Sequence, residues 1–241
     1  MTTSQSTLRS IALEQPAAIR VFERFHLDYC CGGNRPLAEA CAQKGIATEA
    51  VLAALAEASA GAEPEADFTQ AAPSALIRHI VQTHHAYVRN ELPRLLSMAE
   101  RSAARHGQIH PEVDQIERQL RQLAGELTLH LDKEEKILFP RIEALEQSRM
   151  SHASLPHACF DRVETPIQAL LLEHQAAGAL LEEMRAATQN FAPPAGACPT
   201  LVGLYRGLED FERDLHRHVH LENNLLFTLA IALEKETLVS Q

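Results

Sequence analysis

Two histidine–glutamate pairs with the same spacing are the residues of this sequence best suited to chemistry. The segments HLDKEEKILF, starting at His130, and HVHLENNLLF, starting at His218, align without a gap. In each segment a glutamate follows the histidine by four positions, as Glu134 and as Glu222. Residues four apart on a helix project from the same face, so both side chains of a pair can reach one metal cluster.

A further histidine precedes each pair at nearly the same distance along the chain. His85 stands before His130 and His174 stands before His218, which predicts two copies of one helical hairpin. His84 is the alternative to His85, but the apolar spacing around His85 favours that residue. A single histidine on an apolar face is more often a core residue than a ligand, whereas two matched sets are hard to obtain by chance.

Six such side chains suit a pair of metal ions better than one catalytic zinc ion, which takes three protein ligands. With both glutamates bridging, each ion has two histidines and two oxygens, which leaves positions for an oxo or hydroxo bridge, water or a diatomic gas. Nitrogen and carboxylate ligands without thiolate favour iron or manganese, and di-iron centres occur in four-helix cores. We therefore expect two iron ions per chain. The predicted ligands are His85, His130, Glu134, His174, His218 and Glu222.

Four long segments of helical periodicity must position these residues. The predicted ligands interrupt the apolar stripes of the segments, which places them in a core. The segment lengths and their Gly- and Pro-containing connections predict an all-α protein with an antiparallel up-down-up-down four-helix bundle over residues 74–236. His216 and His220 fall about 200° around the last helix from His218, so we expect them on the solvent side. The segments lie at about 74–106, 112–148, 162–190 and 199–236.

A smaller unit precedes the bundle. Residues 1–60 carry signals for short helices that begin near Pro16, near Pro36 and at Thr48. Residues 61–73 contain Gly, Pro and acidic residues without apolar periodicity, which indicates a linker. The sequence thus predicts a small helical domain tethered to the bundle.

Two vicinal cysteines lie in this small domain. Cys30 and Cys31 are followed by two glycines, which let the backbone turn and leave the thiols accessible. One interpretation is a helix end with two incidental cysteines. The other is a thiol site for redox exchange or for passing on iron or nitric oxide, although C-C is a weaker signal than C-x-x-C.

Two glutamates stand close to the predicted ligands along the chain. Glu126 precedes His130 by four positions, and Glu173 adjoins His174. One hypothesis is that both acids line a polar route by which iron, protons or water reach the core. The alternative is that they are solvated acids on helix faces.

Composition excludes several classes of protein. The chain has 241 residues with 5% aromatic residues and no Trp, and its Ala- and Leu-rich composition favours helix. A net charge of −10 without a basic stripe argues against nucleic-acid binding. No segment is apolar enough to span a membrane and no signal peptide is evident, so we expect a cytoplasmic protein without membrane partners. Five cysteines without a secretory signal argue against a disulfide framework.

The ligand segments resemble the hemerythrin-like family, and specifically the repair-of-iron-centres proteins, over residues 74–236. The stretch LDYCCGGNRPLAEAC, residues 27–41, resembles the small cysteine domain that such proteins carry before the bundle. One departure is LLFTLA in the last helix, where the family tends to place a Pro after LF. The matching stretches are HLDKEEKILFP from His130, HVHLENNLLF from His218, EHQAAG around His174 and HAYVRNELP from His85.

The resemblance implies a cytoplasmic di-iron protein, commonly a homodimer, that restores iron–sulfur clusters damaged by nitric oxide or oxidants. Its expected partners are the damaged iron–sulfur proteins, with nitric oxide or dioxygen as small ligands. Iron donation without enzymatic turnover is the first expectation. The alternatives at the same site are reduction of nitric oxide or peroxide, sensing of a gas, and iron storage.

Overall fold

The computed structural model describes residues 2–61, 67–151, 160 and 162–239. These residues form helices, and the only β-type pairing among them is an isolated bridge between Thr7 and Pro36. The all-α prediction is therefore confirmed. None of the helices in this part of the chain is both long and apolar enough to cross a membrane.

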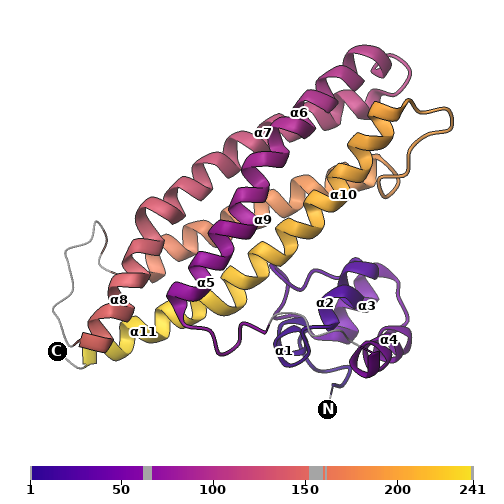
Figure 1. The fold of residues 1–241 in the computed structure, drawn as a ribbon. Helices are drawn as coiled ribbons and strands as arrows, with labels where there is room; N and C mark the ends of the chain where they lie inside the picture. The colour runs from indigo at the N-terminus through magenta and orange to yellow at the C-terminus, as the bar shows by residue number, and fades with distance from the viewer. Residues whose placement is uncertain (1, 62–66, 152–159, 161, 240–241) are drawn as a thin grey trace.

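Four antiparallel rods form the elongated bundle seen in Figure 1, as predicted. Three of them are interrupted by one π-helical turn, labelled η. The first rod comprises α5 (Pro73–Ile80), η1 (Val81–His85) and α6 (Ala86–His106). The second comprises α7 (Pro111–Lys133), η2 (Glu134–Leu138) and α8 (Phe139–Ser151). The third is α9 (Glu164–Ala187), and the fourth comprises α10 (Pro199–His220), η3 (Leu221–Leu226) and α11 (Phe227–Val239).

Proline marks the beginning of three of the rods. Pro73, Pro111 and Pro199 each occupy the first turn of their helix. Backbone N–H groups there have no partner within the helix, so proline, which lacks an N–H, loses no hydrogen bond. This local preference explains why the sequence located these helix starts to within a residue.

The bundle core is divided into two apolar clusters. One contains Leu92, Leu120 and Phe211 and fills the end formed by α6, α7 and α10. The other contains Ile80 and Leu138 and fills the end formed by α5, α8 and α11. Each fully buried Leu or Ile contributes roughly 1.5–3 kcal/mol. Together the two clusters hold the rods in place around a polar layer that lies between them.

The small domain has a core of its own and packs beside the last rod (Figure 1). Its helices are α1 (Leu8–Glu14), α2 (Ala18–Arg24), α3 (Leu37–Lys44) and α4 (Thr48–Gly61). The sequence analysis does not anticipate α1, whose first turn is capped by the Thr7 side chain accepting a hydrogen bond from the Ser10 N–H. Arg217 of α10 forms a bidentate ion pair with Glu23 of α2, which fastens the domain to the bundle.

The docking of the small domain on the last rod overturns the expectation that His220 faces solvent. The side chain is only 3% exposed, its ring lies 5.4 Å from that of Tyr29, and Asn224 donates a hydrogen bond to its Nδ1. Burial lowers the pKa of His220 to about 4, so the ring stays neutral. His216 is half-buried beside Tyr29. The prediction is wrong because the periodicity of one helix does not reveal that a second domain covers its outer face.

Candidate metal centre

Six side chains converge in the polar layer between the two apolar clusters. They come from all four rods, and none is more than 3% exposed. The structure thus brings together every predicted ligand: His85 of η1, His130 of α7, Glu134 of η2, His174 of α9, His218 of α10 and Glu222 of η3. That these residues bind metal stays a prediction.

The four histidines form two pairs. The Nε2 atoms of His85 and His218 lie 3.1 Å apart, and those of His130 and His174 lie 2.9 Å apart. The first pair joins the first and fourth rods, and the second pair joins the second and third rods. Each pair therefore combines one histidine from each predicted hairpin. We call the first pair subsite 1 and the second pair subsite 2.

Each glutamate offers one oxygen to each subsite. Glu134 places Oε2 3.4 Å from His85 Nε2 and Oε1 3.4 Å from His130 Nε2. Glu222 places Oε1 2.9 Å from His218 Nε2 and Oε2 3.2 Å from His174 Nε2. Both carboxylates therefore face both subsites.

The donor atoms of the cluster fit cations rather than one another. Within the described part of the chain, both oxygens of Glu134 and Oε2 of Glu222 are buried without a hydrogen-bond partner. The paired Nε2 atoms face each other at a distance where two lone pairs repel unless a proton or cation lies between them. A buried carboxylate costs several kcal/mol without compensation. Nitrogen and oxygen donors without thiolate suit iron, manganese or zinc.

Protons take the place of a cation in the metal-free cluster. Burial acts to lower the pKa values of His85 and His130, but Glu134 and Glu222 outweigh it and raise them to about 10 and about 9. Burial acts in the opposite sense on Glu222, yet His218 and His174 hold its pKa well below the usual range. Loading with metal must therefore displace protons from the histidines.

We expect the metal-free protein to lose stability in alkaline solution. The folded-state pKa values of His85 and His130 exceed the ordinary 6.5, so their stabilisation is complete below that pH and is lost as the pH rises through about 9 and about 10. Urea denaturation after chelation, at stepped pH, measures this loss. The metal-loaded protein should not show it, and a flat or rising stability of the chelated protein would contradict the assignment.

The outer nitrogens of three of the four histidines in the cluster have hydrogen-bond partners that fix the rings. His85 Nδ1 donates to Glu135 (2.7 Å), and His174 Nδ1 faces Asn223 Oδ1 at 2.8 Å. These partners leave Nε2 free to bind metal, and such contacts typically strengthen metal binding. Neither residue was predicted from the sequence, although the repeat contains a signal for both. Each follows the ligand glutamate of its hairpin directly.

Of the two predicted outer acids, only Glu173 lies beside the cluster. It accepts a hydrogen bond from His130 Nδ1 at 2.8 Å and also pairs with Lys133. Glu126 is exposed and accepts a hydrogen bond from Gln122, so the structure does not bring it to the cluster. Leu123 and Leu127 mark the core-facing side of α7, and Glu126 lies outside that stripe.

The π-helical turns coincide with the predicted ligands. His85 ends η1, Glu134 begins η2, and Glu222 lies within η3. Such turns are rare and frequently occur at functional sites because they change which side chains face the core. The sequence analysis assumed regular α-helices and did not predict them.

His84 does not join the cluster. Its Nδ1 lies 3.0 Å from Asp214 Oδ1, and its ring stacks on that of His218 with 5.6 Å between ring centres. The apolar spacing that favoured His85 therefore selected the histidine that the structure places among the donors.

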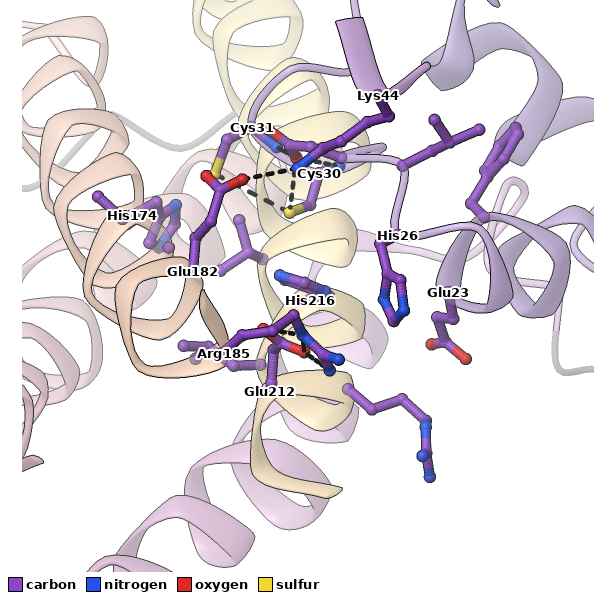
Figure 2. Close-up of a pocket in the computed structure, with 18 of the residues that line it drawn as sticks. Glu23, His26, Cys30, Cys31, Lys44, His174, Glu182, Arg185, Glu212 and His216 are labelled. Carbon is purple, nitrogen blue, oxygen red and sulfur yellow. Dashed lines mark hydrogen bonds and ion pairs between the residues drawn. The ribbon is translucent and has the colours of Figure 1, made fainter. Parts of the chain in front are cut away.

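The vicinal cysteines lie next to the cluster, across a cavity between the small domain and the bundle. The cavity has a volume of about 900 Å³ and is lined by Cys30 and Cys31 on one side and His174 on the other (Figure 2). Asn223 links the two sides, because its amide donates to the Cys30 carbonyl at 3.2 Å while its oxygen faces His174. The small domain thus contacts a residue that holds a predicted ligand.

The two thiols differ in accessibility. Cys30 is buried against the bundle core, whereas Cys31 is half-buried, so the expected exposure does not hold for Cys30. Cys30 is buried because its loop docks onto the bundle. The two glycines that follow the cysteines indicate a turn but give no sign of this docking. Contact with Cys31, burial and Asp28 together raise the pKa of the Cys30 thiol well above its usual range.

Two family models match the chain. The hemerythrin HHE cation-binding domain matches residues 76–230, and a domain of unknown function, ScdA_N, matches residues 4–59. An iron–sulfur cluster repair protein YtfE from Yersinia pseudotuberculosis is 35% identical over 225 residues, which are 93% of this chain and 96% of that protein.

Further relatives carry similar names. The iron–sulfur cluster repair protein YtfE from Edwardsiella ictaluri is 36% identical over 231 residues, covering 96% of this chain and 99% of that protein. A probable iron–sulfur cluster repair protein from Haemophilus influenzae is 34% identical over 229 residues, covering 94% and 97%. These matches extend over both the small domain and the bundle.

Proposed function

Because the chain belongs to the hemerythrin HHE cation-binding family, and within it to the iron–sulfur cluster repair proteins, we propose that it restores damaged iron–sulfur clusters by donating iron. The donor is a di-iron centre held by the six converging side chains. The observation that carries this proposal is the placement of Glu134 and Glu222. Each presents one oxygen to each histidine pair, as a site for two cations requires.

The roles of the residues follow from the geometry. His85 and His218 would hold one ion and His130 and His174 the other, and Glu134 and Glu222 would offer an oxygen to each. The iron pair, when bound, supplies exchangeable iron and open positions for a small ligand such as nitric oxide or dioxygen. No thiolate belongs to this set, which favours release over the tight binding typical of structural thiolate sites.

Release of iron requires that the buried carboxylates remain compensated. The Nε2 atoms of His85 and His130 take up protons when iron leaves, because Glu134 and Glu222 keep the pKa values of these rings high. The protein can therefore alternate between an iron-loaded and a protonated cluster without leaving two unpaired buried charges. The cavity that reaches His174 gives small molecules and ions an approach to the centre.

We expect two iron ions per chain after anaerobic purification, because the cluster offers two complete donor groups. Elemental analysis and the visible spectrum check this. The loaded protein should then transfer iron to an apo iron–sulfur protein and restore the activity of a damaged cluster enzyme. The metal-free protein and an equal amount of free iron serve as controls.

Two results would contradict the proposal. Recovery of one zinc ion without iron would remove the di-iron centre. Continuous consumption of nitric oxide or peroxide with an electron donor, while the iron stays bound, would assign the centre to reduction instead of donation. Binding of nitric oxide without turnover or transfer would favour a sensor.

A further inference from the structure

Asp28 fixes the loop that carries the vicinal cysteines. Its Oδ1 accepts hydrogen bonds from the backbone N–H groups of Cys30 (3.2 Å) and Cys31 (2.9 Å), and its Oδ2 accepts one from the Gly32 N–H (2.8 Å). A Cβ on Gly32 would lie 2.9 Å from Oδ2, so glycine allows this close approach. The three backbone contacts hold both thiols on the same side of the loop as the carboxylate.

The distance between the two thiols suits a shared metal ion. Their sulfur atoms lie 3.9 Å apart. Two thiolates bound at about 2.3 Å to one tetrahedral ion lie about 3.8 Å from each other. A disulfide fits less well, because adjacent Cα atoms across a trans peptide are about 3.8 Å apart and disulfides usually need at least about 4.4 Å.

From this geometry we infer a second metal site, in which Cys30 and Cys31 bind one thiophilic cation such as Zn²⁺ or Fe²⁺, with Asp28 as the third donor. The three donor atoms lie within 4.8 Å of one another, and the Cys30 thiol is 3.2 Å from Asp28 Oδ1. Each thiol gives up its proton to solvent as it binds, so one ion displaces two protons.

The surroundings of the thiols determine what kind of site this is. The cavity in front of them leaves room for a water molecule or an exchanging ligand as the fourth donor (Figure 2). A site with an open position exchanges its ion more readily than a closed structural site. Its two sulfur donors also give it a preference for softer ions. The six-residue cluster, which has only nitrogen and oxygen donors, does not share this preference. This site does not depend on iron donation by the cluster.

The test uses the full chain with its six-residue cluster already loaded with iron under anaerobic conditions. Titration with Cd²⁺ should give one further bound ion per chain and a thiolate-to-metal charge-transfer band in the ultraviolet. The Cys30→Ser, Cys31→Ser double variant should lose both signals and keep its iron. Cys198→Ser, which removes a thiol that contacts His106 in the bundle, should retain both signals.

A second set of measurements tests the site without relying on the folding of the double variant. Cys31 is only half-buried, so Cys31→Ser alone should fold. It should weaken Cd²⁺ binding at least about tenfold, because even the loss of a residue that only orients a metal ligand typically costs about 10–100-fold. Zn²⁺ should also slow alkylation of Cys31 in the unmodified chain. Absence of a further ion, persistence of the band in the double variant, or equal loss in Cys198→Ser would each overturn the inference.

Discussion

Replacement of Glu222 by glutamine is expected to abolish binding of both metal ions, whereas replacement of His85 by glutamine should remove only one. Glu222 presents Oε1 to His218 and Oε2 to His174, so it serves both subsites. A glutamine keeps the shape but replaces one oxygen with an NH₂ donor that repels a cation, and it removes the negative charge that both ions need. His85 contacts subsite 1 alone.

Metal content after anaerobic loading, read by elemental analysis and native mass spectrometry, checks both variants. Glu135→Gln is the matched control, because Glu135 lies next to the predicted bridging residue Glu134 in sequence but contacts only the outer nitrogen of His85 and the guanidinium of Arg89. That control should keep both ions and bind the ion of subsite 1 about 10–100-fold less tightly. Full metal content in the Glu222 variant would show that the carboxylate does not bridge.

The convergence of the six predicted ligands could be predicted from the sequence because two hairpins repeat the same pattern. One histidine in an apolar stripe carries little information, but the matched placement of His130 with Glu134 and of His218 with Glu222 fixes the register of both hairpins. That register in turn locates His85 and His174. Burial then follows from helical periodicity, since the same stripes that carry Leu127 and Leu215 into the core carry the ligands.

What the sequence did not reveal depends on contacts between elements. The π-helical turns lie where the predicted ligands face the polar layer, and no local sequence preference predicts them. The burial of His220 and Cys30 depends on how the small domain docks, which a pattern within one helix does not encode. Glu126 shows that proximity along the chain to a predicted ligand is not enough, because the buried Leu123 and Leu127 define the core-facing side of α7 and Glu126 lies outside it.

The repeat is also less symmetric in its outer contacts than in its ligands. Glu173 precedes His174 and accepts a hydrogen bond from His130, but the matching position before His85 is His84. His84 stacks on His218 and gives it no hydrogen bond, and His218 Nδ1 is buried without a partner among the described residues. Subsite 1 therefore contains one histidine whose outer nitrogen is not fixed by a hydrogen bond among the described residues, whereas its Nε2 faces Glu222 and His85, and this difference sets the two subsites apart.

Substitution of both vicinal cysteines by serine should leave the proposed di-iron centre intact and strongly impair repair. The six-residue cluster contains no thiolate, so two iron ions should remain and the visible spectrum should be unchanged. The link from the loop to His174 should also persist, because Asn223 contacts the carbonyl of Cys30 and not its thiol. What the variant lacks is the pair of sulfur atoms facing the cavity beside His174.

The measurement is recovery of a damaged iron–sulfur enzyme by the iron-loaded Cys30→Ser, Cys31→Ser variant, which we expect to fall at least about tenfold below the unmodified chain, as for the loss of one metal-site contact. Cys41→Ser is the matched control, because Cys41 is fully buried in the small-domain core and tests whether weakened packing alone impairs repair. That variant should repair normally once folded. Full repair by the double variant would make the two thiols incidental to function, and loss of its iron would mean that they belong to the centre itself.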